Sequence, residues 1–405
     1  MSDLRVSKAT YEQRFAAIQQ FLADEGLGGL LAYSPPMEHK WGQTGHVSFL
    51  SGWADHDRLA DSVVVVPAQG RPALLFAGLP FMRDLVLEHS PLDDVRLVQA
   101  VDPNAVAVDP KAGPAPDSFG GQARAVLRDR GVTEPSIGVV GVENMPFPFH
   151  QALAAQLGDD LRHVDDIVAD LRSTKSPDEL DLMRHAARLS DLGFETMLAT
   201  AKPGYRGIEV VAEMERVIRR QGADHAKYWM ASGPPPDWEN VRLELKPHLR
   251  TLQRGDLMSA CSYVCYRGYW CHGHRAGVLQ EPCPKLEQMM KIGREVQDAG
   301  LAVMRAGNPV GLMSRTIRER AAAHGWQIEG GRIGHGMGLD YAERPNMTES
   351  NDALLQPGTT GVVHTAFALP GSGKMFVPLG DVCHVTADGP ELLMGFPREP
   401  FVAGA

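Results

Sequence analysis

The sequence predicts two domains: an α/β domain over residues 1–164 and an α+β domain over residues 165–405. In the first third, helical apolar patterns alternate with short apolar runs that are typical of strands. A sharp helix start near residue 176 then separates this part from a second set of helices and longer strands. A chain of 405 residues is long enough for both domains to bury a core of their own.

The N-terminal domain alternates predicted helices and strands. Helices are expected over 11–23 and 80–89, and the stretch 102–118, rich in Pro, Ala and Asp, is expected to be a surface loop. The turn at 67–70 predicts a hairpin between two of the strands. The apolar runs that predict strands are 30–33, 63–66, 73–76 and 137–142.

The C-terminal domain is expected to begin with a long helix. Ser176-Pro177-Asp178-Glu179 provides a helix N-cap, a proline in the first helical position and the glutamate of a capping box. Further helices are expected near 207–221, 284–306 and 309–324. Strands are expected near 226–231, 256–265, 269–279, 361–367 and 380–386.

Composition and charge narrow the classes of function. The net charge of −10 and the absence of a basic run argue against a nucleic-acid or anionic-membrane surface. No apolar stretch approaches the roughly 18 residues of a membrane-spanning helix, and the N-terminus lacks the apolar core of a signal peptide. We therefore expect a cytoplasmic protein with neither nucleic-acid nor membrane partners, whose five cysteines are reduced.

Four segments of the chain have a distinctive order and spacing: residues 172–187, 255–275, 334–339 and 355–358. They contain Gly255-Asp256, Gly334-His335-Gly336 and Pro357-Gly358, and together they resemble the pita-bread family of creatinase, aminopeptidase P and prolidase. The resemblance implies a creatinase-type N-terminal domain and a pita-bread C-terminal domain. It also implies a homodimer in which the N-terminal domain of one subunit lies over the active site of its partner.

The resemblance further implies five positions that hold two metal ions in the metallopeptidases of this family. Only His335 keeps the family's residue. The other four positions, where the family has carboxylates, hold Cys261, His272, His364 and Gly380, with Asp381 beside the last. Without a bridging carboxylate, we predict no dinuclear hydrolytic centre, no bound metal and no cofactor. A family histidine is also replaced by Ala342, although Glu343 follows it.

The residues at the former ligand positions predict a site of a different kind. Side chains two apart in a strand share a face, so Trp270, His272 and His274 should point the same way. If the fold holds, His272, His335 and His364 converge, and Cys261 joins them. The imidazoles could be free acids, bases and hydrogen-bond donors, or three histidines and Cys261 could bind one zinc or iron ion. A cluster of core histidines in an inactive protein is the third alternative.

Other polar residues are candidates for binding a small-molecule substrate. Arg58, contributed by the partner subunit, and Arg344 are expected to hold a carboxylate, because guanidinium groups bind carboxylates through two hydrogen bonds. Glu343 is expected to fix a cationic group. Asp381, His274, Cys261 and Trp270 complete the predicted substrate contacts.

From these residues we predict a metal-independent hydrolase that cleaves a non-peptide C–N bond of a zwitterionic or carboxylate-bearing metabolite. Creatinase and ectoine hydrolase are the family members whose mode this resembles. His272 or His364 would activate water or protonate the leaving nitrogen, while His335 and His274 orient the substrate. The alternatives are a mononuclear zinc or iron hydrolase or lyase, similar to the iron-dependent dimethylsulfoniopropionate lyases of this fold, and a non-catalytic binding module.

Overall fold

The computed structural model describes residues 4–35, 44–53, 61–79, 81–98, 100, 118–132, 136–158, 160–234, 249–369 and 374–404. The chain divides into two compact units between Arg172 and Ser173. The domain boundary predicted after residue 164 lies one helix earlier and stays a prediction. Among the described helices, none is long and apolar enough to cross a membrane.

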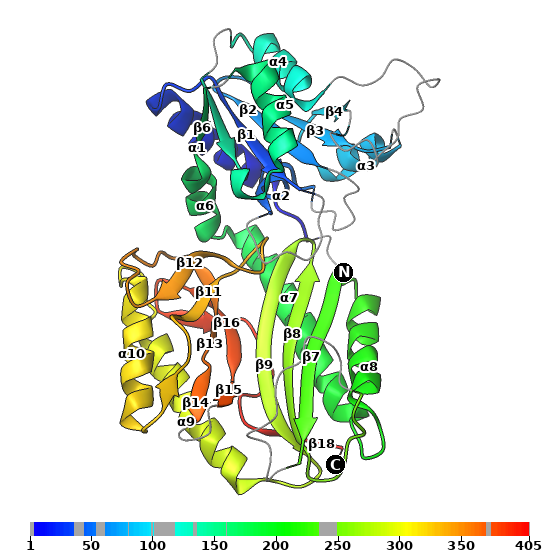
Figure 1. The fold of residues 1–405 in the computed structure, drawn as a ribbon, viewed down its shortest axis with the longest axis vertical. Helices are drawn as coiled ribbons and strands as arrows, with labels where there is room; N and C mark the ends of the chain where they lie inside the picture. The colour runs from blue at the N-terminus through cyan, green and yellow to red at the C-terminus, as the bar shows by residue number, and fades with distance from the viewer. Residues whose placement is uncertain are drawn as a thin grey trace. The chain divides into compact units, whose positions relative to one another are not determined.

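The N-terminal unit is built on a six-stranded mixed sheet in the order β4-β3-β2-β1-β5-β6 (Figure 1). The expected hairpin is present, because Val65 pairs with Ala73 in antiparallel β2 and β3. Four of the strands are buried along their whole length, which requires cover on both sheet faces. The strands are β1 (Gly29–Ser34), β2 (Ser62–Pro67), β3 (Ala73–Ala77), β4 (Asp94–Val98), β5 (Ile137–Val140) and β6 (Leu161–His163).

Within the described residues, six α-helices accompany this sheet. A core cluster fills the space between the sheet and two of them, α4 and α5, through residues such as Phe119 and Phe149. The helix expected over 80–89 is present as α3. The helices are α1 (Lys8–Asp24), α2 (His46–Ser51), α3 (Met82–His89), α4 (Phe119–Asp129), α5 (Phe147–Leu157) and α6 (Asp165–Ser173).

The C-terminal unit begins with the capped helix that the sequence predicts. The Ser176 hydroxyl accepts a hydrogen bond from the Glu179 amide at 3.3 Å, and the Glu179 carboxylate accepts one from the Ser176 amide at 2.9 Å. This capping box starts α7 (Pro177–Thr200), because it satisfies amide groups that the first helical turn leaves without partners. The other helices are α8 (Gly207–Arg220), α9 (Pro284–Val303) and α10 (Val310–Ala323).

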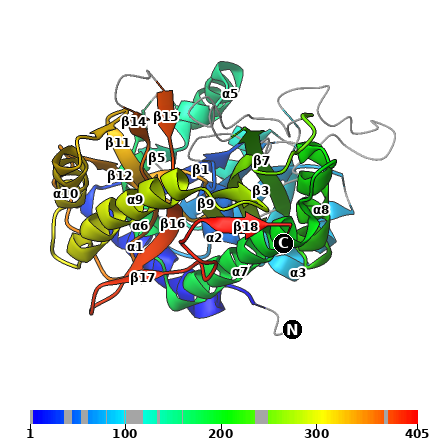
Figure 2. The same cartoon turned by 90° about the horizontal axis from the view of Figure 1, so that it is seen from below.

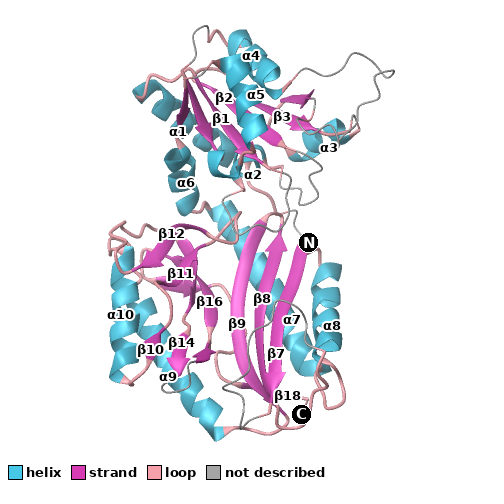
Figure 3. Cartoon of the chain, in the orientation of Figure 1, coloured by secondary structure: helices cyan, strands magenta, loops and turns pink. Residues whose placement is uncertain are grey.

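A nine-stranded sheet forms the body of this unit, in the order β12-β11-β13-β16-β9-β8-β7, with β17 beside β16 and β18 beside β9. Figures 1 and 3 show the three long strands β7–β9 on one side and the shorter strands β11, β13 and β16 on the other. The strands are β7 (His225–Gly233), β8 (Leu257–Tyr266), β9 (Tyr269–Leu279), β11 (Arg332–Gly336), β12 (Glu343–Thr348), β13 (Thr360–His364), β16 (Gly380–Val385), β17 (Pro390–Leu392) and β18 (Phe401–Ala403). A small separate sheet contains β10 (Gln327–Ile328), β14 (Phe367–Leu369) and β15 (Lys374–Phe376).

The two faces of the nine-stranded sheet have different surroundings. On the helix face, Ser262 of β8 hydrogen-bonds Ser190 of α7 at 2.7 Å, and Ile333 and Val363 join the apolar cluster of α9 and α10. Figure 2 shows β18 and the C-terminus lying beside α7. We call the other side the open face, because α7, α9 and α10 do not pack against it.

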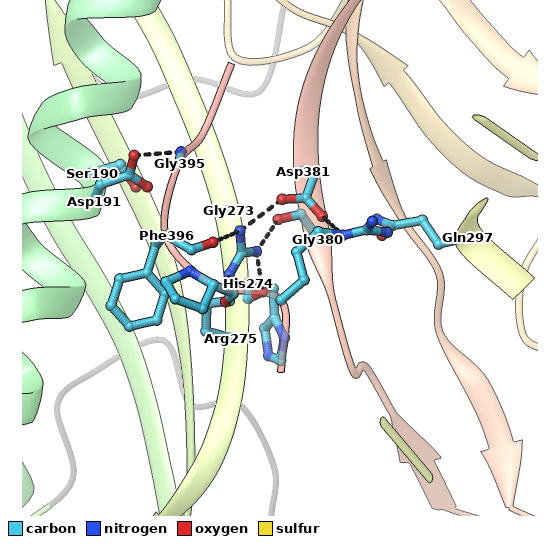
Figure 4. Close-up of polar contacts among 12 residues, drawn as sticks. Ser190, Asp191, Gly273, His274, Arg275, Gln297, Gly380, Asp381, Gly395 and Phe396 are labelled. Atoms are coloured by element: carbon cyan, nitrogen blue, oxygen red, sulfur yellow. Dashed lines mark hydrogen bonds and ion pairs between the residues drawn. The ribbon is translucent and has the colours of Figure 1, made fainter. Parts of the chain in front are cut away.

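A buried arginine joins the two halves of the sheet. Within the described residues, β9 and β16 pair only through His274 and Gly380. Arg275 donates to the carbonyl oxygens of both residues at 2.9 Å and to Asp381 at 2.7 Å, as Figure 4 shows. It also donates to the carbonyl oxygens of Phe396 at 3.1 Å and Pro397 at 3.0 Å. These bonds hold β9, β16 and the C-terminal segment together on the helix face.

Candidate active site

The open face carries one row of side chains that crosses five strands. In β7, β8 and β9, Trp229 pairs with Cys261 and Cys261 with His274. His274 pairs with Gly380 of β16, and Gly380 with His364 of β13. Directly paired residues of antiparallel strands point to the same face. Three of the five former ligand positions therefore lie in a single row.

A neighbouring row completes the cluster. His272 pairs with Tyr263 of β8, and His335 of β11 pairs with Val362 of β13. The ring centroids of His272 and His364 are 5.2 Å apart, and those of His335 and His364 are 5.5 Å apart. The structure thus brings together the three histidines that the sequence analysis singled out, although they come from three separate strands.

Backbone carbonyls determine which ring nitrogen of two histidines carries the proton. His272 Nδ1 lies 2.8 Å from the carbonyl oxygen of Ser262, and His335 Nδ1 lies 2.9 Å from that of Gly336. Because a carbonyl oxygen only accepts hydrogen bonds, each Nδ1 is the donor, which leaves Nε2 with a lone pair in the neutral ring. The Nε2 atoms of His335 and His364 are buried and have no hydrogen-bond partner within the described chain. They are therefore available to a bound molecule.

Burial keeps the imidazoles neutral. It lowers the pKa of His335 to about 4 and those of His274 and His364 to about 3. The pKa of His272 is also lowered, first by burial and then by the neighbouring His364. Taking a charged imidazolium out of water costs free energy, so the neutral form is favoured near pH 7. His274 has a hydrogen-bond partner in this state, since its Nε2 lies 3.0 Å from Ser259 Oγ.

Cys261 is a neutral thiol in this structure. Its Sγ lies 3.6 Å from Tyr263 Oη and 3.6 Å from both ring nitrogens of His272. Burial raises the pKa of Cys261 to about 12, so the thiolate needed for nucleophilic attack is disfavoured. The thiol can contact a substrate or act as a weak donor, and its place among the substrate-binding residues stays a prediction.

Two tyrosines belong to the cluster and were not predicted. The Tyr341 ring centroid lies 4.9 Å from Tyr263, 5.1 Å from His335 and 5.2 Å from His272. Trp270 touches the same ring from 6.2 Å, as expected for a residue on this face. Burial raises the pKa of both phenols, so they remain protonated hydrogen-bond donors. The position of Tyr263 two residues after Cys261 on a strand was a signal that could have revealed it.

The structure places several predicted substrate contacts elsewhere. The Glu343 carboxylate binds the chain's own Lys175 at 2.9 Å, with both side chains buried, so we no longer assign it to a cationic group of the substrate. Asp381 lies on the helix face, where it binds Arg275 at 2.7 Å and Arg398 at 3.3 Å, and it does not join the imidazoles. Arg344 is exposed on β12, where it shares the face of Asn346 two residues later, and its role as a carboxylate contact stays a prediction. Arg58 lies outside the described residues.

Gly380 has a specific role in the row. A Cβ atom at this position would lie 3.1 Å from His274 Cβ and 3.2 Å from His364 Cβ, which is closer than most such contacts. The missing side chain therefore lets an imidazole sit on either side of β16.

The metal ions that the family resemblance implies do not fit these residues. A dinuclear centre needs carboxylates that bridge the ions and neutralise their charge. The two carboxylates that the sequence analysis placed at the site, Glu343 and Asp381, are bound to lysine and arginine side chains instead. Across the described parts of the chain, no group of three or more His, Cys, Asp or Glu side chains has the geometry to hold a metal ion.

The two-domain fold, with its nine-stranded C-terminal sheet, defines a protein of the pita-bread class. A model of metallopeptidase family M24 matches residues 181–387, and the chain belongs to this family. An uncharacterized peptidase of Bacillus subtilis, YqhT, is 28% identical over 264 residues, which cover 63% of this chain and 72% of the relative. The Xaa-Pro dipeptidase of Pyrococcus horikoshii is 24% identical over 269 residues, 64% of this chain and 74% of the relative.

Solved structures agree on the architecture. The Xaa-Pro dipeptidase from Bacillus anthracis superposes with a TM-score of 0.77 at 19% identity, covering 97% of this chain and 99% of the other. The prolidase from Pyrococcus horikoshii gives a TM-score of 0.74 at 19% identity, covering 96% and 100%. These structures confirm the predicted creatinase-type N-terminal domain and pita-bread C-terminal domain.

The comparisons contradict the predicted reaction. The matching proteins carry the names of peptidases and dipeptidases, whereas we had predicted a hydrolase of a non-peptide C–N bond and a non-peptidase member of the family. That prediction is wrong. It treated the loss of the metal-binding carboxylates as a change of substrate, although the residues that changed are those that would hold metal. The mononuclear-metal lyase and the non-catalytic module gain no support from these names either.

Proposed function

We propose that this chain hydrolyses short peptides, and that the open-face imidazoles serve the reaction in place of a dinuclear metal centre. The observation that carries the proposal is the pair of buried, partnerless Nε2 atoms of His335 and His364, on rings 5.5 Å apart. Family membership and the peptidase names of the relatives support a peptide as the substrate. The Xaa-Pro dipeptides named for two of these relatives are the first candidates.

In the proposed reaction, the His335 Nε2 lone pair accepts a proton from water while the water oxygen attacks the peptide carbonyl carbon. The Gly336 carbonyl holds the Nδ1 proton of the same ring and stabilises the imidazolium that forms. The phenols of Tyr341 and Tyr263 can donate hydrogen bonds to the carbonyl oxygen as it gains negative charge. As the C–N bond breaks, the leaving nitrogen takes the proton that His335 removed from water. We propose that His364 relays it: its Nε2 lone pair accepts the proton from the His335 imidazolium and passes it to the nitrogen, so that both rings end neutral.

Two residues have supporting roles in this proposal. The His272 ring is held by the Ser262 carbonyl and packs against Tyr341, so it orients the phenol and the substrate. His274 is engaged by Ser259 and fills the centre of the row. Cys261 and Trp270 line the same face and contact the substrate.

Metal independence forms part of the proposal, because the neutral imidazoles, thiol and phenols supply no negative charge to balance two cations.

The test is hydrolysis of a panel of Xaa-Pro and other dipeptides by the purified chain, with metal content measured on the same sample. We expect cleavage that persists in EDTA and falls at least about 100-fold in H335N and H364N, the range expected for losing an acid or base. H89N, which changes an exposed histidine in the N-terminal unit, is the matched control. Activity that appears only after adding a divalent metal would refute metal independence. No cleavage of any peptide would refute the proposed function.

We also propose a homodimer in the cytoplasm. Three large apolar side chains around the start of α3 support an interface on the N-terminal unit, since exposed apolar clusters often mark contacts between proteins. Leu79 is 36% exposed, Phe81 69% and Leu85 41%. Light scattering should give a dimer mass for the natural chain and a monomer mass for the F81S/L85S variant. A monomeric natural chain would contradict the proposal.

A further inference from the structure

One cation near the imidazoles has no role in the reaction described above. Arg332 is the first residue of β11, and its side chain is exposed. It forms no hydrogen bond or ion pair with any described residue. Most arginines of this unit, such as Arg318 and Arg398, are instead bound to carboxylates. An exposed guanidinium without a partner is available to a ligand.

The strand register places Arg332 on the open face. Ile333 belongs to the apolar cluster on the helix face, and Gly334 pairs with Met347 of the same cluster. Two successive residues therefore share the helix face, which is what an irregularity in a strand produces, and the register does shift at this point. The residues on either side of them, Arg332 and His335, must then both point to the open face.

The partner strand gives the same result independently. In β12, Asn346 pairs with His335, and Thr348 pairs with Arg332. Asn346 and Thr348 are two residues apart in a strand, so their side chains share a face. Because paired residues also share a face, Arg332 and His335 lie on one side of the sheet. The two positions are three residues apart, or about 10 Å along an extended strand, which a guanidinium on its long side chain can largely span.

The electrostatic influence of Arg332 agrees with this placement. Its positive charge contributes to the lowered pKa of both His335 and His364, and it also lowers the pKa of Tyr341, against the larger effect of burial. A cation acts on three groups of the cluster only if it lies near all of them. Arg332 therefore stands at the exposed side of the same cluster.

We propose that Arg332 binds the free carboxylate of the substrate and makes the site specific for peptides whose C-terminal carboxylate lies next to the cleaved bond, as in a dipeptide. This proposal rests on the proposed peptidase function for the identity of the substrate, though not for the binding of a carboxylate. Guanidinium groups bind carboxylates through two parallel charge-assisted hydrogen bonds, which fix both position and orientation.

The experiment compares binding of N-acetyl-L-proline and N-acetyl-L-prolinamide by calorimetry, since the two differ only in the carboxylate. We expect the natural chain to bind the acid at least about tenfold more tightly than the amide, the range of a charge-assisted hydrogen bond. R332M should bind both equally, and R332K should keep part of the preference. R344M, which removes the arginine predicted from the sequence, should keep the full preference.

Each outcome decides between the two proposals. Equal binding of acid and amide by the natural chain, or an acid preference that survives in R332M, overturns the role of Arg332. Loss of the preference in R344M alone would transfer the role to Arg344. If R332M loses the preference while no peptide is cleaved, the carboxylate site stands and the peptidase function fails. If dipeptides are cleaved and R332M raises KM at unchanged kcat for them, but not for the corresponding dipeptide amides, both proposals stand.

Discussion

Acid should destabilise the C-terminal unit through its buried imidazoles, and the H335N variant isolates the contribution of one of them. The pKa of His335 falls from 6.5 to about 4 on folding because the ring is buried. Below pH 6.5 the unfolded chain therefore binds a proton that the folded chain excludes. This difference lowers the free energy of unfolding. The loss is absent above pH 6.5, grows as the pH falls and is complete below about pH 4.

The size of the effect follows from this difference. Each pH unit between the two pKa values changes the free energy of unfolding by about 1.4 kcal/mol. His335 should therefore lower this free energy by about 2 kcal/mol at pH 5 and by about 3 kcal/mol at pH 4. The His335 side chain is 1% exposed, so solvent screens this effect little. Asparagine at position 335 can still donate to the Gly336 carbonyl but cannot bind a proton.

The assay is urea unfolding of the natural chain and H335N at several pH values from 7.5 to 4.5, in EDTA. The free energy of unfolding of the variant, relative to the natural chain, should rise by about 1.4 kcal/mol per pH unit below pH 6. H89N serves as the control for loss of an exposed imidazole. A constant difference between H335N and the natural chain across this range would show that His335 is not held neutral by burial.

Three further predictions concern the framework of the site. D381N should lower the free energy of unfolding by roughly 3–5 kcal/mol, because it leaves Arg275 buried without a counter-charge; chemical denaturation checks this, and a loss below about 1 kcal/mol would contradict it. K175M should lower the free energy of unfolding by a similar amount, because it leaves the Glu343 carboxylate buried without a counter-charge. The double variant K175M/E343L should recover most of this loss, since no lone charge is then buried. Additive effects in the double-mutant cycle would contradict the pairing. G380A should cost roughly 1–3 kcal/mol and reduce peptide cleavage, because its Cβ crowds His274 and His364; unchanged stability and activity would contradict the close approach.

Much of the framework could be predicted because it depends on local patterns. The capping box at Ser176 is a short-range hydrogen-bond motif, and it is present. Strand alternation predicted that His272 and His274 share a face, and the family resemblance predicted that His335 and His364 approach them. The same alternation rule should have separated Asp381 from Gly380, since neighbours in a strand point to opposite faces. We had instead kept Asp381 with the site because of its closeness in sequence.

Other parts of the site depend on tertiary structure that no local pattern encodes. Tyr341 lies in a loop, where no periodicity specifies direction, and only the fold brings it against His272 and His335. The pairing of Glu343 with Lys175 joins residues 168 positions apart in the chain. The face of Arg332 depends on an irregularity in β11 that a sequence does not reveal. The reaction was predicted wrongly because the loss of metal ligands does not by itself name a substrate.

The pairing between β9 and β16 determines how far apart the two groups of imidazoles lie. His272 and His274 belong to one half of the sheet, while His335 and His364 belong to the other, and a single residue pair connects the halves in the described structure. A small rotation about this hinge would change the spacing between the two groups of imidazoles while leaving each half intact. The Arg275 guanidinium spans this joint on the opposite face, so it fixes the distance between the imidazoles of the two halves.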